Sequence, residues 1–423
     1  MILPVLLFGA WLAGLGSGTA TDPVLPAGYE AVSQNPAALT LPGQPVATLE
    51  YLRIRLHLTS SSLTLADCRD YLYRQSFLGE ADKQRLLDHV GQGPLRLGLD
   101  EDLQLLHGQY RSSGVAADYQ LLENAFLPRD MCELALRGNE LNRVYKLDGF
   151  GSDTMSVLRV TVAHGILVRT HSTVPWLDTI RVGLGLSWLH GLRYSGVTAS
   201  TGELLTTAYT MTGFVHQVQV QANGGDGFGL TVGGSLPLGR RLHLDLVLRD
   251  PIGIIFWYNN SRVREVSYEL KSLDVPVFIR EQRLDSFLIG TTVSRPGAAL
   301  GTKLPGVLAF GGGYQASKIL AVGAMVNLPV TSSPTNSIPA SALPFVGLQL
   351  KFVPIQSAGV GISAGWGGQP GPAGRSEGAL WVQLILGIRA RGLLFSAGAE
   401  MTGRSFENVK TATFQLGLGY EFG

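Results

Sequence analysis

The sequence predicts an all-β protein: a transmembrane antiparallel β-barrel of about 14 strands, with an N-terminal hatch and small helical insertions. Charged residues make up 15% of the chain, against about 25% in average soluble domains, and Gly supplies 54 of its 423 residues. After the first 20 residues, no apolar run reaches the roughly 18 residues of a transmembrane helix. Such a hydrophobic chain can span a membrane only as a closed barrel. The lipid interior contains no water to hydrogen-bond unpaired backbone groups, and a closed barrel pairs all of them between strands.

The last stretch, Asn408 to Gly423, shows the strand pattern most clearly. Successive strand side chains point to opposite faces, so one face here is apolar and the other polar or small. Its length suits the about 9 to 11 residues of a spanning strand, and its two aromatics suit a membrane-interface girdle. We expect it to close the barrel by pairing with the first strand, although alone it also fits a half-buried soluble strand. The apolar set is Ala412, Phe414, Leu416, Leu418, Tyr420 and Phe422; the other set is Thr411, Thr413, Gln415, Gly417, Gly419 and Glu421.

The same alternation recurs in at least six upstream segments, and the lengths of the connections between strands differ in a regular way. The turn at 389–392 is short, whereas 331–341 and 369–376 are long and polar or Pro-rich. Outer-membrane barrels have short periplasmic turns and long extracellular loops, which this contrast matches. The alternating segments include Ile180–Trp188, Phe214–Gln221, Leu242–Leu248, Val346–Phe352, Ala358–Trp366 and Leu393–Met401.

The N-terminal region divides into two segments ahead of the barrel at 47–423. Residues 1–20 are apolar and end in small residues, which predicts a signal peptide cleaved near Ala20. The usual basic n-region is missing, so an incorrectly chosen start codon and an uncleaved anchor remain as alternatives. Residues 21–46 are Pro- and Gly-rich, lack periodicity and are expected to form a hatch or plug.

Helical insertions are expected near 62–92 and 127–138. Leu65–Gln75 and Glu80–Val90 have helical character, the latter ending at Gly91, and Pro128–Arg137 ends at Gly138. These helices would form a lid, a plug or a small appendage, and the alternation does not fix the side of the membrane on which they lie.

Two cysteines, Cys68 and Cys132, lie in these insertions. In an oxidising compartment they could form a disulfide. Two unpaired buried thiols are the alternative.

A motif after the predicted signal peptide carries a family resemblance. Ala31 to Leu39 contains Asn35-Pro36, where Asn before Pro favours an extended or turn conformation. The motif resembles the hatch segment of the long-chain fatty-acid transporter (FadL) and PorV superfamily, whose N-terminus folds into the lumen as a plug. The candidate hatch residues are Asn35, Pro36, Ala37, Ala38 and Leu39.

A second stretch supports the resemblance. Leu127 to Leu141, continued by Tyr145 to Gly149 and by Leu189 to Tyr194, resembles a signature of an uncharacterised branch of the superfamily. That branch is a domain-of-unknown-function family of predicted outer-membrane proteins. Together the resemblance covers nearly the whole chain after the signal peptide, although its motifs are structural rather than catalytic.

The sequence contains no catalytic constellation. It lacks a G-x-S-x-G elbow, a P-loop, an H-E-x-x-H and a C-x-x-C, so we expect neither an enzyme nor a cofactor. His164 and His171 lack ligand spacing, so no metal site is expected. His216 is expected to face outward without an identifiable Ser partner. A net charge of +1 offers no field for nucleic acid.

The alternation also assigns a set of polar side chains to the barrel interior. They would either line a solute path or hydrogen-bond the plug, and the second role is favoured because buried polar groups in a filled lumen need partners. The set comprises Arg181, Gln217, Gln219, Gln221, Gln349, Lys351, Gln415 and Glu421.

Two functions in the bacterial outer membrane follow from the resemblance. The first is a plugged barrel that passes hydrophobic, fatty-acid-like small molecules through a lumen controlled by the hatch. The second is an accessory or scaffold barrel that docks proteins for secretion or surface attachment. Both place the protein in a lipid bilayer, whereas a soluble all-β lipid-binding protein is a third and more distant reading.

Overall fold

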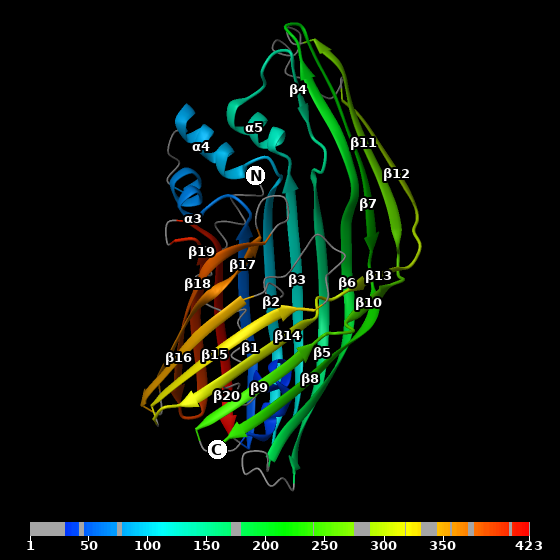
Figure 1. The fold of residues 1–423 in the computed structure, drawn as a ribbon. Coiled ribbons are helices and arrows are strands. Elements are labelled where there is room, and N and C mark those ends of the chain that lie inside the picture. Colours follow the sequence, from blue (N-terminus) through cyan, green and yellow to red (C-terminus); the bar gives the residue numbers. More distant parts are fainter. Residues whose placement is uncertain are drawn as a thin grey trace.

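A computed structural model describes residues 30–41, 46–73, 78–170, 179–239, 241–274, 288–317, 319–330, 345–355, 358–370, 376–405 and 408–422. The predicted signal peptide and residues 21–29 and 42–45 of the predicted hatch segment lie outside these ranges. Within them the chain forms one antiparallel sheet with a few short helices (Figure 1).

The helical elements are α2 (Glu30–Gln34), η1 (Pro36–Thr40), α3 (Leu65–Asp67), η2 (Cys68–Tyr73), α4 (Glu80–Val90) and α5 (Arg129–Arg137). The strands of the first half are β1 (Ala47–Ser60), β2 (Leu95–Tyr110), β3 (Ser113–Leu127), β4 (Arg143–Lys146), β5 (Gly151–Arg169), β6 (Thr179–Thr206), β7 (Thr210–Ala222), β8 (Gly225–Leu238), β9 (Leu242–Arg249) and β10 (Ile254–Trp257). Those of the second half are β11 (Arg262–Asp274), β12 (Leu288–Pro296), β13 (Leu300–Lys303), β14 (Val307–Gln315), β15 (Leu320–Pro329), β16 (Phe345–Ile355), β17 (Ala358–Pro370), β18 (Ser376–Ala390), β19 (Leu393–Gly403) and β20 (Val409–Phe422).

These strands build a closed antiparallel barrel of 14 strands, as the sequence predicted. The described sheet has 20 strands because some barrel strands are interrupted. β7 and β8 run on as one strand, as do β9 to β11 and β12 to β14, while β4 only flanks β6. The last strand, β20, pairs antiparallel with β1, from Ala47 opposite Phe422 to Thr59 opposite Thr411, which confirms the expected closure.

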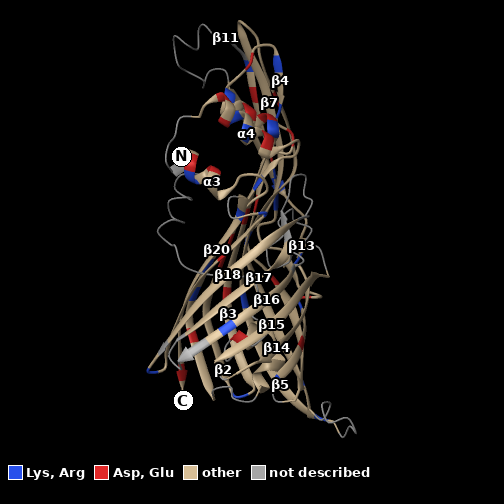
Figure 2. Ribbon diagram, turned by 60° about the vertical axis from the view of Figure 1, so that its left-hand side comes forward, with Lys and Arg blue, Asp and Glu red and all other residues tan. Residues whose placement is uncertain are grey.

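Polar side chains face the barrel interior and apolar side chains face outward, the reverse of the arrangement in a soluble protein. Polar groups such as Thr413 and Gln383 are 0% and 1% exposed, whereas the apolar Leu348 is 66% exposed. In Figure 2 the barrel wall is largely free of charge, and charged residues gather around the helices at its upper end. An apolar outer surface over a polar interior is the arrangement that lipid outside and a filled lumen require.

The two ends of the barrel differ in their connections. At the lower end of Figure 1, near the C-terminus, two-residue turns follow β2 and β18, and Arg391 and Gly392 both have positive φ (50° and 86°), as such hairpins need. The upper end carries the long connections 61–94 and 128–150 with α3, η2, α4 and α5. The helical insertions therefore lie at the end of the barrel with the long connections, opposite the end with the two-residue turns. Among the described residues, no helix is sufficiently long and apolar to cross a membrane.

The helical insertions pack into a small cap. Leu87 and Val90 of α4 form a buried cluster with Leu95 of β2 and Cys132 of α5. α4 and α5 match the predicted helices closely, and both end at a glycine with positive φ, Gly91 and Gly138 (68° and 79°). The predicted helix at 65–75 is irregular in its described part, where a three-residue α3 runs directly into a π-helix, η2; residues 74 and 75 lie outside the described ranges.

The disulfide considered for Cys68 and Cys132 is not formed, because both are free thiols. Cys132 is buried in the apolar cluster between α4 and α5, and Cys68 lies on η2, outside that cluster. Burial raises the pKa of both thiols, which keeps them protonated and poorly reactive. The alternative of two unpaired cysteines therefore holds.

The cap is tied to the sheet by an ion pair whose strength should depend on pH. Arg143 of β4 donates to both carboxylate oxygens of Glu133 on α5, at 2.8 and 2.7 Å. These hydrogen bonds hold the pKa of Glu133 below its usual 4.5. A depressed folded-state pKa stabilises the fold above the unfolded-state value, and that contribution disappears as the pH falls through the folded-state pKa.

We therefore expect the α5 amides to lose protection below about pH 4.5 in hydrogen-exchange measurements corrected for the intrinsic pH dependence of exchange. Glu133→Gln should remove this pH step, at a cost of about 1.5 to 3 kcal/mol at neutral pH. An unchanged pH step in Glu133→Gln would show that another group controls the cap.

Candidate functional site in the barrel lumen

The five candidate hatch residues fold into a short plug segment. Asn35 caps the 3-10 helix η1, and its Oδ1 accepts from the backbone N of Ala37 at 3.1 Å. Pro36 occupies the first helical position, where its missing N–H costs nothing. All five, Asn35 to Leu39, are buried.

Three wall glycines form a socket for this segment. Gly165 of β5 lies opposite Gly183 of β6, which in turn lies opposite Gly233 of β8. A Cβ on Gly183 would lie 2.1 Å from the backbone N of Ala37, and one on Gly165 would lie 2.7 Å from the carbonyl O of Pro36. Because neither gap holds a methyl group, these positions let the hatch backbone contact the wall directly. We call Gly165, Gly183 and Gly233 the glycine socket.

Three polar contacts anchor the hatch around the socket. Asn35 Nδ2 donates to Asp245 Oδ1 at 3.2 Å, and Arg181 Nε donates to the carbonyl O of Thr40 at 3.1 Å. Glu30 of α2 pairs with Arg53 of β1 at 3.0 Å. Asp245 and Arg53 are themselves 2% and 6% exposed, so each contact satisfies a group shielded from bulk water.

Above the hatch, the lumen contains a charged cavity of about 160 Å³, which we call the chamber. Ser33 and Gln34 of α2 contribute to its lining, so the hatch forms part of its boundary. Most charges around it are paired: Arg55 with Asp102, Arg159 with Asp250 at 2.8 Å, and His107 with Asp118 at 2.5 Å.

The guanidinium of Arg249 in the chamber has spare hydrogen-bonding capacity. Nη2 of Arg249, at the end of β9, is buried and has no hydrogen-bond partner among the described residues. No ion pair within 4.0 Å joins Arg249 to a described carboxylate, although the neighbouring Asp250, which is bound by Arg159, acts electrostatically on it. A buried donor without a partner costs about 1 to 3 kcal/mol, so an anion placed here would be stabilised.

The other wall of the chamber is apolar. Leu122, Val157 and Leu304 line it and also belong to a buried cluster around Trp257. The chamber therefore presents a cationic donor and an apolar surface to the same small volume.

The sequence-predicted interior residues occupy three separate places. Arg181 contacts the hatch, and Gln415 lines the chamber. Gln221, Gln219 and Gln217 form a ladder of amide hydrogen bonds that ends at the carbonyl O of Phe150, near the upper end. The remaining three, Gln349, Lys351 and Glu421, lie on β16 and β20 and are buried or half-buried.

Most chamber residues were not predicted. Arg53, Arg55 and His57 alternate with Leu52, Ile54 and Leu56 along β1, a pattern that marks charged inward positions. The signal was weaker in β2, where Glu101 stands between Asp100 and Asp102 and interrupts the alternation with apolar residues. The pairing of these charges depends on strand register, so it could not be read from one strand.

His216 has a serine partner, contrary to the sequence-based expectation. Its Nδ1 lies 2.8 Å from Ser267 Oγ on β11, the residue directly across the ladder. No carboxylate of the described chain lies within ion-pair distance of His216, so the orienting acid of a Ser-His-Asp triad is missing. The described residues also contain no cluster of His, Cys, Asp or Glu that could hold a metal ion.

Comparison with solved structures identifies the fold. The crystal structure of a Pseudomonas aeruginosa FadL homologue matches with a TM-score of 0.51 at 12% identity, covering 97% of this chain and 98% of that chain. A TodX deltaS2S3 mutant monoaromatic hydrocarbon channel matches with a TM-score of 0.50 at 9% identity, over 96% and 99% of the two chains. No protein-family model and no curated protein matches by sequence. The chain therefore has the fold of the FadL-type outer-membrane transporters, which confirms the resemblance noted in its sequence.

Proposed function

We propose that this protein passes hydrophobic small molecules with an acidic head group, of the fatty-acid type, across the bacterial outer membrane. No chemical step is involved. The barrel supplies the membrane passage, the chamber is the binding site, and the hatch is the plug that must move before the solute reaches the periplasm.

The fold supports a passage for hydrophobic compounds. The FadL homologue and the hydrocarbon channel with this fold are barrels of nearly the same length, so the likeness extends over the whole described wall. The polar interior and apolar exterior of this chain are suited to the same membrane setting.

The single observation that specifies the head group is Arg249. A neutral hydrocarbon in the chamber would take water away from the charges around it and give no hydrogen bond in return, which is unfavourable. A carboxylate would accept from Nη2 of Arg249 in a charge-assisted hydrogen bond. Its alkyl chain could then lie against Leu122, Val157 and Leu304.

The position of the hatch gives the order of events. Ser33 and Gln34 border the chamber, and the glycine socket lies beyond them toward the lower end. A solute bound at Arg249 therefore stands directly in front of the plug. Release toward the periplasm requires the hatch to leave the socket.

The test compares uptake of a labelled long-chain fatty acid with uptake of the alcohol of equal chain length, in vesicles that contain the protein. We expect the wild type to take up the acid in preference to the alcohol. In Arg249→Gln the affinity for the acid should fall roughly 10- to 100-fold, which corresponds to the loss of a charged hydrogen bond of about 1.5 to 3 kcal/mol.

Arg193→Gln is the matched control, because Arg193 belongs to β6 but is exposed and is not part of the chamber. Equal transport of acid and alcohol by the wild type would contradict the proposed head group. Absence of uptake of either compound would contradict transport itself.

A further inference from the structure

Two neighbouring barrel strands are broken at the same two heights. β10 and β13, of four residues each, pair with one another between the lower breaks at 250–253 and 304–306 and the upper breaks at 258–261 and 297–299. The other edge of β10 pairs with β8, whereas β13 has no second strand partner among the described residues. We call β10 and β13 together the flap, because they are joined to the described wall along one edge.

The chain leaves the strand conformation at both ends of β10. Asp250 in the lower break and Asn260 in the upper break have positive φ (46° and 49°), outside the strand region. On the attached edge, Gly225 and Gly227 of β8 face β10 without side chains. The other two β8 residues at this edge have side chains: Phe228 lies opposite Ile254, and Asp226 accepts a hydrogen bond from the Tyr258 hydroxyl. Rotation of the flap about this edge must displace these two side chains.

The largest side chain that the flap carries into the lumen is Trp257. Trp257 is 0% exposed, and its ring lies over Gly191 of β6, where a Cβ would be 2.5 Å from the indole. The ring of Tyr194 packs beside it at a centroid distance of 5.6 Å. Nε1 of Trp257 donates to Thr302 Oγ1 at 2.8 Å, and Thr302 belongs to the flap as well. The indole can therefore move with the flap without losing its buried hydrogen bond.

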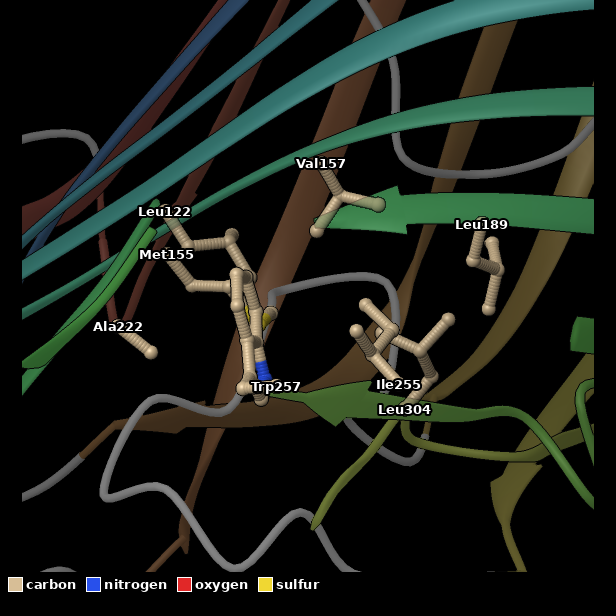
Figure 3. Close-up of a cluster of buried hydrophobic side chains, with 8 residues drawn as sticks. All are labelled: Leu122, Met155, Val157, Leu189, Ala222, Ile255, Trp257 and Leu304. Carbon is tan, nitrogen blue, oxygen red and sulfur yellow. The ribbon is translucent and has the colours of Figure 1, made fainter. Parts of the chain in front are cut away.

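The cluster around Trp257 lies between the chamber and the upper end of the barrel. Leu122, Val157 and Leu304 belong both to the cluster and to the chamber lining. On its other side, Ala222 of the cluster directly follows Gln221, the last residue of the amide ladder. Figure 3 shows the cluster side chains grouped around the indole. Because all eight members are buried, the chamber is separated from the ladder on this side by a dry apolar layer.

We propose that the flap is a gate, and that a solute enters the chamber when the indole of Trp257 leaves its niche over Gly191. This inference rests on the proposed function and adds an explanation of how the passage selects apolar solutes over water and ions. An alkyl chain or flat ring can replace the indole against Leu122 and Met155, which lie beside it in Figure 3, whereas water and ions are excluded from an apolar constriction.

The experiment compares Trp257→Ala with Trp381→Ala. Trp381 is the matched control because it also points inward, is 6% exposed and packs on Met325, but it lies in the unbroken strand β18. We expect Trp257→Ala to raise the rate of labelled fatty-acid uptake several-fold, and Trp381→Ala and Trp257→Phe to stay near wild type. Heat-modifiable gel migration verifies that each variant is folded.

A second measurement does not depend on transport. In protein whose other tryptophans are replaced by Phe, a brominated alkyl acid should quench the fluorescence of Trp257. Quenching supports the gate even if no uptake is seen, in which case only the proposed function fails. Uptake by folded Trp257→Ala equal to that of Trp381→Ala, together with unquenched fluorescence, would overturn the gate.

Discussion

A single methyl group at position 183 is expected to unseat the hatch. The Cβ of Gly183→Ala would lie 2.1 Å from the backbone N of Ala37 and 2.2 Å from the backbone C of Pro36. Backbone atoms cannot rotate away as a side chain can, so either the hatch or strand β6 must shift. Overpacking of this kind costs about 1 to 3 kcal/mol, which corresponds to roughly a 5- to 150-fold change in the docked population.

The measurement is the rate at which a polar maleimide labels a cysteine in the hatch. Ala38→Cys places the thiol at a fully buried position, in a background where Cys68 and Cys132 are replaced by Ser. We expect Gly183→Ala to accelerate labelling by at least about tenfold, in line with the overpacking cost.

Gly185→Ala is the control for this experiment. It lies on the same face of β6 two residues away, but its Cβ would meet Pro36 Cγ at 3.5 Å, an ordinary contact. Labelling that is equally slow in both variants would show that the hatch tolerates the added methyl group. Equally fast labelling in the parent protein would show that the hatch is already undocked.

Loss of Arg159 is expected to be the most destabilising change in the chamber. Its Nη2 lies 2.8 Å from Asp250 Oδ2, and the Asp250 side chain is only 9% exposed. Asp250 begins the lower break with φ at 46°, so its carboxylate is held in place by the turn. Arg159→Met therefore leaves a buried carboxylate without its counterion, which costs about 3 to 5 kcal/mol.

Unfolding by urea in detergent micelles provides the measurement. The double variant Arg159→Met with Asp250→Asn should recover most of the lost stability, because it removes both charges of this pair and leaves neither partner uncompensated. Arg295→Met is the control: Arg295 pairs with Glu265 at 2.6 Å, but the two side chains are 63% and 33% exposed. That variant should lose no more than about 1 kcal/mol. Losses of similar size in both variants would contradict a specific role for burial.

The sequence predicted those features of the fold that depend on a single strand or helix, such as the two faces of a strand or the end of a helix. The two faces of β20 are as predicted, because alternation needs only the strand itself. The ends of α4 and α5 were predicted within one residue, since Gly91 and Gly138 stop their helices locally. The end of the barrel at which these helices lie became clear only from the arrangement of the strands and their connections.

The interruptions of the wall were missed, although their residues carry turn signals. Asp250-Pro251 with Gly253 marks the lower break, and Asn259-Asn260-Ser261 marks the upper one. Each signal alone resembles an ordinary connection between two strands. Only the pairing of β10 with β13 and β8 shows that the chain continues in the same direction through the wall.

The sequence by itself predicted the class of protein and the facing of the regularly alternating strands, because these depend on residue type and on a period of two. The tertiary structure alone decided which inward residues meet. Asn35 hydrogen-bonds to Asp245, which lies 210 residues later in the sequence. The three glycines of the glycine socket lie side by side because the strand register aligns them. Register and barrel closure are properties of the whole sheet, so no single stretch of the chain contains them.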